Sequence, residues 1–141
     1  MTKAKSVAAH AEGSETEAFG AYAHAEGQKA KAHGYNSHAE GFNTKALNNY
    51  THAEGYETEA TAEYAHAEGF YSKATANVAH AEGKSTANGV ASHTEGWQTT
   101  VESGYGAHAE GTNTTADGDG THAEGDGTLS KGKYGLHAEG H

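Results

Sequence analysis

Histidine and glutamate recur together, two residues apart and followed by glycine, at ten places in the chain. The pairs are His10/Glu12, His24/Glu26, His38/Glu40, His52/Glu54, His66/Glu68, His80/Glu82, His93/Glu95, His108/Glu110, His122/Glu124 and His137/Glu139. Such a pair can transfer protons, form an ion pair or bind a transition metal. An active site needs one differentiated pocket, which ten equivalent copies do not offer. We therefore expect no catalytic residue and no enzyme activity, and the pattern favours pairing or binding.

The charge balance also indicates pairing. The chain has 19 acidic residues, nine lysines and no arginine, which gives a net charge of −10 with neutral histidines. Ten acidic residues are the motif glutamates, so the other nine balance the nine lysines. Protonation of the ten motif histidines would cancel the net charge. An acidic chain without arginine is not expected to bind nucleic acid.

Large apolar residues are too few for a conventional core. Leu, Ile, Val and Phe together account for 10 of 141 residues, whereas a share below roughly 20% with high net charge usually indicates disorder. The alternative is that regular repetition replaces the core. The absence of cysteine excludes disulfides and thiolate metal sites. No apolar run could span a membrane and no signal peptide follows Met1, so targeting and anchor segments are expected to lie outside this chain.

The motif histidines follow one another at spacings of 13 to 15 residues, mostly 14. Counting each histidine as position 1, small residues occupy alternate positions, which is the period of a β-strand. Each fourteen residues divide into two sevens, each a short strand followed by a corner. The sequence therefore predicts an all-β chain, residues 1–141, forming a single solenoid domain of about ten coils with its small residues inside. Changes of one residue in coil length, at Lys84-Ser85 and Gly104–Gly106, are expected at corners.

The stretches Ser37–Gly41 and Thr51–Gly55, which read S-H-A-E-G and T-H-A-E-G, carry a family resemblance. The pattern resembles the YadA-like head repeat of trimeric autotransporter adhesins, and related repeats occur in phage tail fibres. The resemblance covers about residues 2 to 140. It implies a left-handed parallel β-roll and a homotrimer in which two outward positions of each coil meet at the threefold interface. In the family those positions are apolar, whereas here they are His and Glu.

The resemblance implies a structural and adhesive role as a trimeric fibre segment of a bacterial surface adhesin head or a phage tail fibre. We expect the ten pairs to form a polar trimer interface, with an extracellular, cell-surface or virion-tail location and a host-surface or glycan receptor as a further partner. Two alternatives remain open. The pairs could be a solvated ladder on a monomer, or a metal-binding or pH-responsive trimeric module with the motif histidines as candidate ligands for zinc, nickel or iron. No cofactor is assigned.

Residues two apart on a strand share a face. Positions 1 and 3 therefore point outward from one side of the roll, and positions 8 and 10 from the other, where the residues vary as solvent permits. Pairing between subunits is expected to raise the pKa of the histidines and lower that of the glutamates. Trimer stability should then peak between roughly pH 4.3 and 6.5.

Aromatic residues gather at predicted corners. Phe42, Tyr56, Phe70 and Trp97 occupy position 5, where they could stack along the axis or form a platform for a glycan or another host-surface ligand. The stretch Asp117–Gly120 lacks the spacing of known calcium loops and is predicted to be a turn. His33 and His141 lie off the repeat and are predicted to be surface residues.

Overall fold

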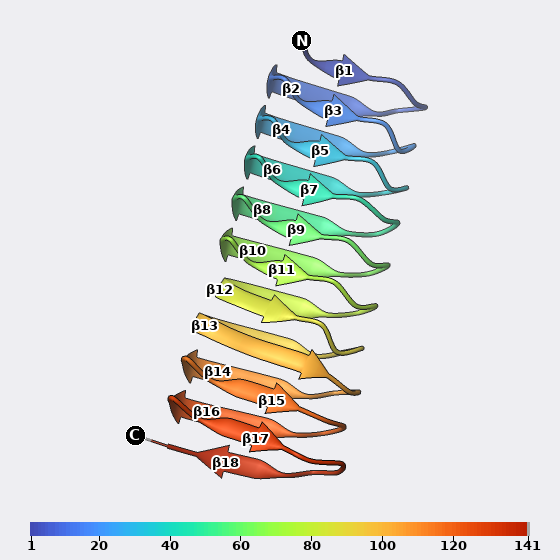
Figure 1. The fold of residues 1–141 in the computed structure, drawn as a ribbon. Helices are drawn as coiled ribbons and strands as arrows, with labels where there is room; N and C mark the ends of the chain where they lie inside the picture. Colours follow the sequence, from blue (N-terminus) through green and yellow to red (C-terminus); the bar gives the residue numbers. More distant parts are fainter. Residues whose placement is uncertain (141) are drawn as a thin grey trace.

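The computed structural model describes residues 1–140 as a parallel β-solenoid of about ten coils, so the predicted all-β fold is confirmed (Figure 1). Eighteen strands and no helix are present in this range. The coils stack along one axis, with the two ends of the chain at opposite ends of the rod. His141, predicted to be a surface residue, lies outside the described residues.

Each coil contributes two runs of strand, and the first run carries the motif. The motif strands are β2 (His10–Ser14), β4 (His24–Gln28), β6 (His38–Phe42), β8 (His52–Tyr56), β10 (His66–Phe70), β14 (His108–Thr112), β16 (His122–Asp126) and β18 (His137–Glu139). The opposite runs are β1 (Lys3–Ala4), β3 (Glu17–Ala18), β5 (Lys31–Ala32), β7 (Lys45–Ala46), β9 (Glu59–Ala60), β11 (Lys73–Ala74), β15 (Thr115–Asp117) and β17 (Leu129–Lys131). Two longer strands, β12 (His80–Ala87) and β13 (His93–Ser103), serve both runs.

The fourteen-residue period places identical residues beside one another. In the paired strands β6 and β8, His38 lies beside His52 and Glu40 beside Glu54. Neighbouring strands run parallel throughout the stack, as β8 and β10 and β4 and β6 also do. Main-chain bonds run from coil to coil, as in the 2.9 Å bond from the His38 N–H to the Thr51 carbonyl. The sequence period is thus the register of the sheet.

The interior consists of small side chains, as the alternation predicts. Ala39, Ala53 and Ala67 of the motif strands and Ala46 and Ala60 of the opposite strands are fully buried. The largest fully buried side chain is that of Val101. Some buried hydroxyls bond to nearby carbonyls, as the Ser37 hydroxyl does to the Gly34 carbonyl at 2.7 Å, whereas those of five buried threonines, Thr16, Thr44, Thr58, Thr99 and Thr114, have no hydrogen-bond partner. Only small residues fit because the two runs of each coil lie so close together.

The motif glycine has a backbone role that its size alone does not reveal. Gly41 has a φ of +114°, and a Cβ placed there would lie 2.1 Å from the carbonyl oxygen of Gly55 in the next coil. Its equivalents Gly27 and Gly55 show the same conformation and the same close approach. An L-residue at this position would therefore suffer both an unfavourable φ and a collision with the neighbouring backbone.

Two of the three coils that depart from fourteen residues do so at the predicted corners. In the 13-residue coil, β12 continues through the corner with a register shift between Lys84 and Ser85. In the 15-residue coil that follows it, Gly104 and Gly106 adopt positive φ between β13 and β14. The extra or missing residue is absorbed there, and the motif strands on both sides remain in register.

Candidate functional site: the His–Glu face

The outward side chains of the ten motif histidines and glutamates, called the motif face below, form two parallel rows along the rod. Each histidine ring lies against the ring of the next coil, with centroids 4.6 to 5.0 Å apart. His93 and His108, for instance, stack at 4.9 Å with parallel planes. This row follows directly from the in-register pairing of the motif strands. It brings all ten predicted histidines onto one surface.

Histidine and glutamate pair within one chain. In eight coils the imidazole Nε2 lies 3.4 to 3.8 Å from a carboxylate oxygen of the glutamate two residues later. Two contacts cross between coils instead: His80 Nε2 lies 4.0 Å from Glu68 Oε1, and His137 Nε2 lies 3.4 Å from Glu124 Oε1. Glu68 and Glu124 therefore each face two histidines. His–Glu pairs, which were expected between subunits, therefore also form within one chain, both within a strand and between adjacent coils.

Several of the glutamates predicted to be covered at a trimer interface are open to solvent in the single chain. The side chains of Glu12, Glu26 and Glu95 are 69%, 48% and 43% exposed. Each carboxylate pairs with the histidine of its own strand, Glu12 at 3.5 Å, Glu26 at 3.8 Å and Glu95 at 3.7 Å. These contacts within one strand differ from the predicted contacts between subunits. Burial of these three glutamates would require a second chain, so their interface role stays a prediction.

Several histidine nitrogens on this face are poorly satisfied. The Nε2 atoms of His66, His80, His93, His108 and His122 are buried without a hydrogen-bond partner, as is that of His24. Their glutamate contacts are longer than a good hydrogen bond. A buried polar atom without a partner is unfavourable. The motif face thus holds acceptors or donors that an additional ligand or a second chain could satisfy.

In the single chain, the pKa values of three motif groups shift in the direction opposite to the one expected for pairing between subunits, which stays a prediction. Burial, followed by the charges of the histidines in adjacent coils, lowers the pKa of His66 and His108. Burial raises the pKa of Glu110, and the glutamates of adjacent coils add to this effect. Within one chain, burial and the like groups of adjacent coils outweigh the attraction between each histidine and its glutamate.

In the single chain, these three shifts act against the pH dependence expected for the trimer. A lowered histidine pKa favours the fold above the unfolded value of 6.5, and this contribution is lost as the pH falls through the folded value. A raised glutamate pKa favours the fold below the unfolded value of 4.5, and that contribution is lost as the pH rises through the folded value. His66, His108 and Glu110 therefore oppose a stability maximum between roughly pH 4.3 and 6.5.

Four groups of motif residues have the composition of a metal site. Each combines two histidines of successive coils with the first one's glutamate, with ligand atoms within 4.8 Å of one another. The groups are His66/Glu68/His80, His80/Glu82/His93, His108/Glu110/His122 and His122/Glu124/His137. All three ligands come from one chain. The metal-binding alternative predicted from the sequence was a trimeric module, whereas each of these groups needs only one chain.

The predicted aromatic corner forms a row beside the motif face. Phe42 stacks on Tyr56 at 4.8 Å and Tyr56 on Phe70 at 5.2 Å, and the exposed fractions of Tyr56 and Phe70 are 38% and 44%. Trp97 is separated from them by Lys84, whose ammonium lies 4.5 Å from the Trp97 ring centroid. Three of the four predicted aromatics are therefore in contact, and the fourth continues the row after a cation.

A second row of aromatics lies at the opposite corner. Tyr50 and Tyr64 stack with centroids 5.0 Å apart and planes 1° from parallel. Tyr22 and Tyr35 extend the row by edge-on contacts at 5.5 and 5.7 Å. Many corner residues adopt a positive φ, among them Tyr50 at 57°. The two rows flank the motif strands on either side.

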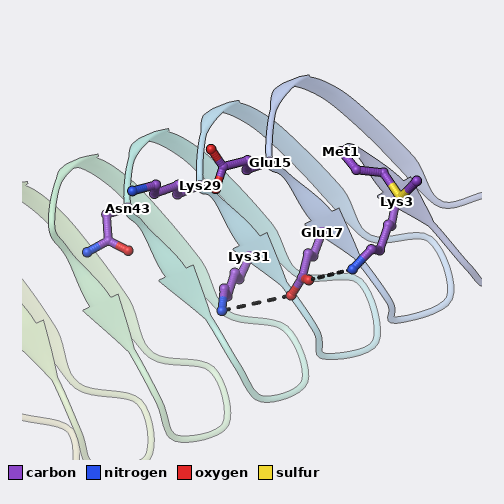
Figure 2. Close-up of a pocket in the computed structure, with 7 residues that line it drawn as sticks. All are labelled: Met1, Lys3, Glu15, Glu17, Lys29, Lys31 and Asn43. Carbon is purple, nitrogen blue, oxygen red and sulfur yellow. Dashed lines mark hydrogen bonds and ion pairs between the residues drawn. The ribbon is translucent and has the colours of Figure 1, made fainter.

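The outward residues at positions 8 and 10, called the second face, form an ion-pair ladder that was not predicted from the sequence. Glu17 lies between Lys3 at 3.5 Å and Lys31 at 3.9 Å, and Figure 2 shows both contacts. Glu59 lies in the same way between Lys45 at 2.6 Å and Lys73 at 3.9 Å. The sequence does show lysine and glutamate at position 8 of successive coils. These charges predict ion pairs only when position 8 of one coil is known to lie beside position 8 of the next.

A cleft of about 330 Å³ opens at the start of this ladder, between Glu15, Lys29 and Asn43 at the corner and Glu17 with its two lysines (Figure 2). Partial burial acts to raise the pKa of Glu17, but Lys31, Lys3 and a bond with His33 outweigh it and hold the pKa below its usual value. The charges around Glu17 therefore compensate one another.

His33 and the Asp117–Gly120 stretch both belong to the second face and its corner. His33 is half-buried, stacks on Phe19 at 4.6 Å and lies 3.3 Å from Glu17. Asp117 lies 3.0 Å from Lys131, and Asp119 accepts a bond from the Tyr105 N–H at 2.9 Å. Gly118 to Gly120 form the predicted turn. Both of its carboxylates are used in contacts within the chain.

Comparison with models of known protein families and with curated proteins found no match. Within residues 1–140, no helix has the length and apolar character needed to cross a membrane.

Proposed function

We propose that this chain is a structural segment of a trimeric fibre in which the motif faces of three copies contact one another. The observation that carries the proposal is the difference between the two faces. The second face pairs its lysines with glutamates inside the chain. The motif face has no lysine, so its ten glutamates stand in one continuous row beside histidines alone, and six of those histidines have a buried, unpartnered Nε2, against only His33 on the second face within residues 1–140.

A neighbouring copy supplies what this face lacks. A glutamate from a second chain can accept from, or pair with, a histidine whose Nε2 has no good partner in its own chain. Ten repeats in one straight line multiply each weak contact along the rod. A polar interface of this kind specifies the alignment of the chains more than it maximises stability. The resemblance to YadA-like heads supports three as the number of chains.

The same resemblance supports placing the fibre on a bacterial surface, as part of an adhesin head, or in a phage tail. An adhesive role requires a surface that contacts a receptor. The exposed row Phe42, Tyr56 and Phe70, followed by Trp97, supports a glycan or another host-surface ligand because flat aromatic rings pack against sugar faces. Ten equivalent pairs on a rod argue against enzymatic catalysis.

The test of the trimer is the mass of the purified protein in solution, measured by light scattering over a range of concentrations. The double variant His38→Glu, His52→Glu places like charges in adjacent coils of the motif face and is expected to be a monomer. Its matched control, Leu47→Glu, Thr61→Glu, adds the same charges in adjacent coils of the second face and should keep the trimer mass. A monomeric natural protein, or a motif-face variant that remains trimeric, would refute the proposal.

A further inference from the structure

We propose that the motif face binds divalent transition-metal ions at two places along each chain, each ion held between successive coils by two histidine nitrogens and one glutamate oxygen. One site is built on His66, Glu68 and His80, and the other on His122, Glu124 and His137. The sites need only one chain. They can therefore form in a monomer, although the histidine nitrogens they use lie on the face that the proposed trimer would cover.

Glu68 and Glu124 distinguish these two places from the rest of the face. Glu68 directs one carboxylate oxygen to each of two stacked histidines, 3.6 Å from His66 Nε2 and 4.0 Å from His80 Nε2. Glu124 does the same, 3.7 Å from His122 Nε2 and 3.4 Å from His137 Nε2. In both cases three ligand atoms from adjacent coils surround one point.

The spacing suits a small cation after minor side-chain movement. Zinc binds imidazole nitrogen and carboxylate oxygen at about 2.0–2.2 Å, so tetrahedral ligand atoms lie roughly 3.3–3.6 Å apart. The observed ligand atoms lie within 4.8 Å of one another. Binding would require rotation of these side chains, of which His137 is exposed and the others are half-buried, on a fixed backbone. The parallel register holds the two histidines of each site in adjacent coils.

Unpartnered nitrogens give a second, independent reason for a ligand at these places. The Nε2 atoms of His66, His80 and His122 are buried and have no hydrogen-bond partner. These same atoms point toward the glutamate of each site. A metal ion would satisfy each nitrogen by accepting its lone pair, which water cannot reach easily once the atom is covered.

The ligand set also selects the class of ion. Two imidazoles and one carboxylate suit zinc, cobalt or nickel, whereas calcium and magnesium prefer oxygen ligands alone. Three protein ligands leave at least one coordination position for water or another group. We therefore expect zinc, cobalt and nickel to bind, and calcium and magnesium to be rejected.

Shared histidines fix the number of ions. The group His80/Glu82/His93 uses His80 of the first site, and the group His108/Glu110/His122 uses His122 of the second. Because one Nε2 serves one ion, the four groups hold at most two ions at once, one involving His80 and one involving His122. The variants His80→Asn and His122→Asn each remove both groups of one stretch.

The experiment is a zinc titration by calorimetry on tag-free full chain that has been stripped with a chelator, repeated with cobalt and followed by its visible spectrum. The natural chain should bind two ions per chain, either single variant one, and the double variant none. The controls His33→Asn and His38→Asn remove a histidine outside the four groups and should still bind two. Circular dichroism checks that each variant remains folded.

The proposal is overturned if the natural chain binds no zinc, or if the folded double variant binds as many ions as the natural chain. Calcium bound as tightly as zinc would also overturn it. Solution mass, measured with and without zinc, separates this result from the previous proposal. A monomer that binds two ions would refute only the trimer, and a trimer without metal would refute only these sites.

Discussion

The Nζ atom of Lys45 lies 2.6 Å from Oε1 of Glu59, fourteen residues further along the chain and one coil away. Lys73, one coil beyond, approaches the same carboxylate at 3.9 Å. Each of these lysines is thus paired with a glutamate that lies one repeat away along the chain. The relationship shows how the period of the sequence sets electrostatic partners as well as backbone register.

Reversing the central charge of this ladder should destabilise the fold. Glu59→Lys places three lysines in adjacent coils, and like charges directly opposite each other on paired strands repel. We expect a loss of about 1 kcal/mol in the free energy of unfolding, decreasing with added salt. Urea denaturation of this variant and of Glu57→Lys, which makes the same charge change at the neighbouring corner, measures the effect. Equal losses in the two variants would contradict the role of the ladder.

The motif glycine should be far less replaceable than a corner glycine elsewhere. Gly41→Ala combines a φ of +114° with a Cβ 2.1 Å from the Gly55 carbonyl oxygen, and we expect a loss of roughly 3 kcal/mol or more. Gly127→Ala has a φ of +66° but no atom within 4 Å of its Cβ, so only the backbone preference is lost, about 1 kcal/mol. Thermal melting of both variants tests the comparison, and similar melting temperatures would count against it.

Asp117 should contribute to stability at mildly acidic pH. A hydrogen bond from the Ser103 hydroxyl, and then the ion pair with Lys131, lower the pKa of Asp117 below its ordinary value of 3.8. Its contribution is therefore complete above that value and is lost as the pH falls through the lower folded value. Asp117→Asn should be less stable than the natural chain near neutral pH, and the difference should shrink below about pH 3.8.

Melting temperatures of the two proteins from pH 7 to pH 2 measure this convergence. Asp126→Asn, which removes an exposed carboxylate from the end of β16, serves as the control and should follow the natural chain throughout. A difference between Asp117→Asn and the natural chain that stays constant across the acid range would show that the carboxylate charge is not the cause.

If the chain recognises a glycan as proposed, loss of the aromatic row beside the motif face should abolish that binding. The double variant Tyr56→Ala, Phe70→Ala removes two stacked, exposed rings, so binding on a glycan array should disappear while the coil interior is untouched. Tyr50→Ala, Tyr64→Ala removes the equivalent pair from the opposite corner and should leave binding intact. If both double variants bind as the natural chain does, the row has only a structural role.

The sequence was sufficient for the fold because one period determined both strand pairing and burial. His38 and His52 are neighbours for the same reason that Ala39 and Ala53 are buried. It was not sufficient for the electrostatics of the motif face. Burial and the histidines above and below His66 lower its pKa, and the balance between these effects and the attraction to Glu68 depends on three-dimensional distances.

The sequence pattern also did not predict the side-chain contacts that depend on both strand register and side-chain direction. Glu68 reaches the histidines of two coils, although most motif glutamates contact only the histidine of their own strand. Lys45 and Glu59 seemed freely variable until the pairing of β7 with β9 made them partners. The alternation of small residues predicts no special role for the motif glycine, because its φ and its distance to the next backbone depend on the stacking of the coils.

Equivalent strands of successive coils pair in register, and this determines how the rod can change length. Removing or duplicating fourteen codons joins the same two edges as before, so one coil of about 4.8 Å is lost or gained without disturbing the coils on either side. A change of seven codons would instead exchange the motif and second faces beyond the junction. Recombination between repeats can therefore lengthen or shorten the rod by one coil at a time, while the motif face continues unchanged along it.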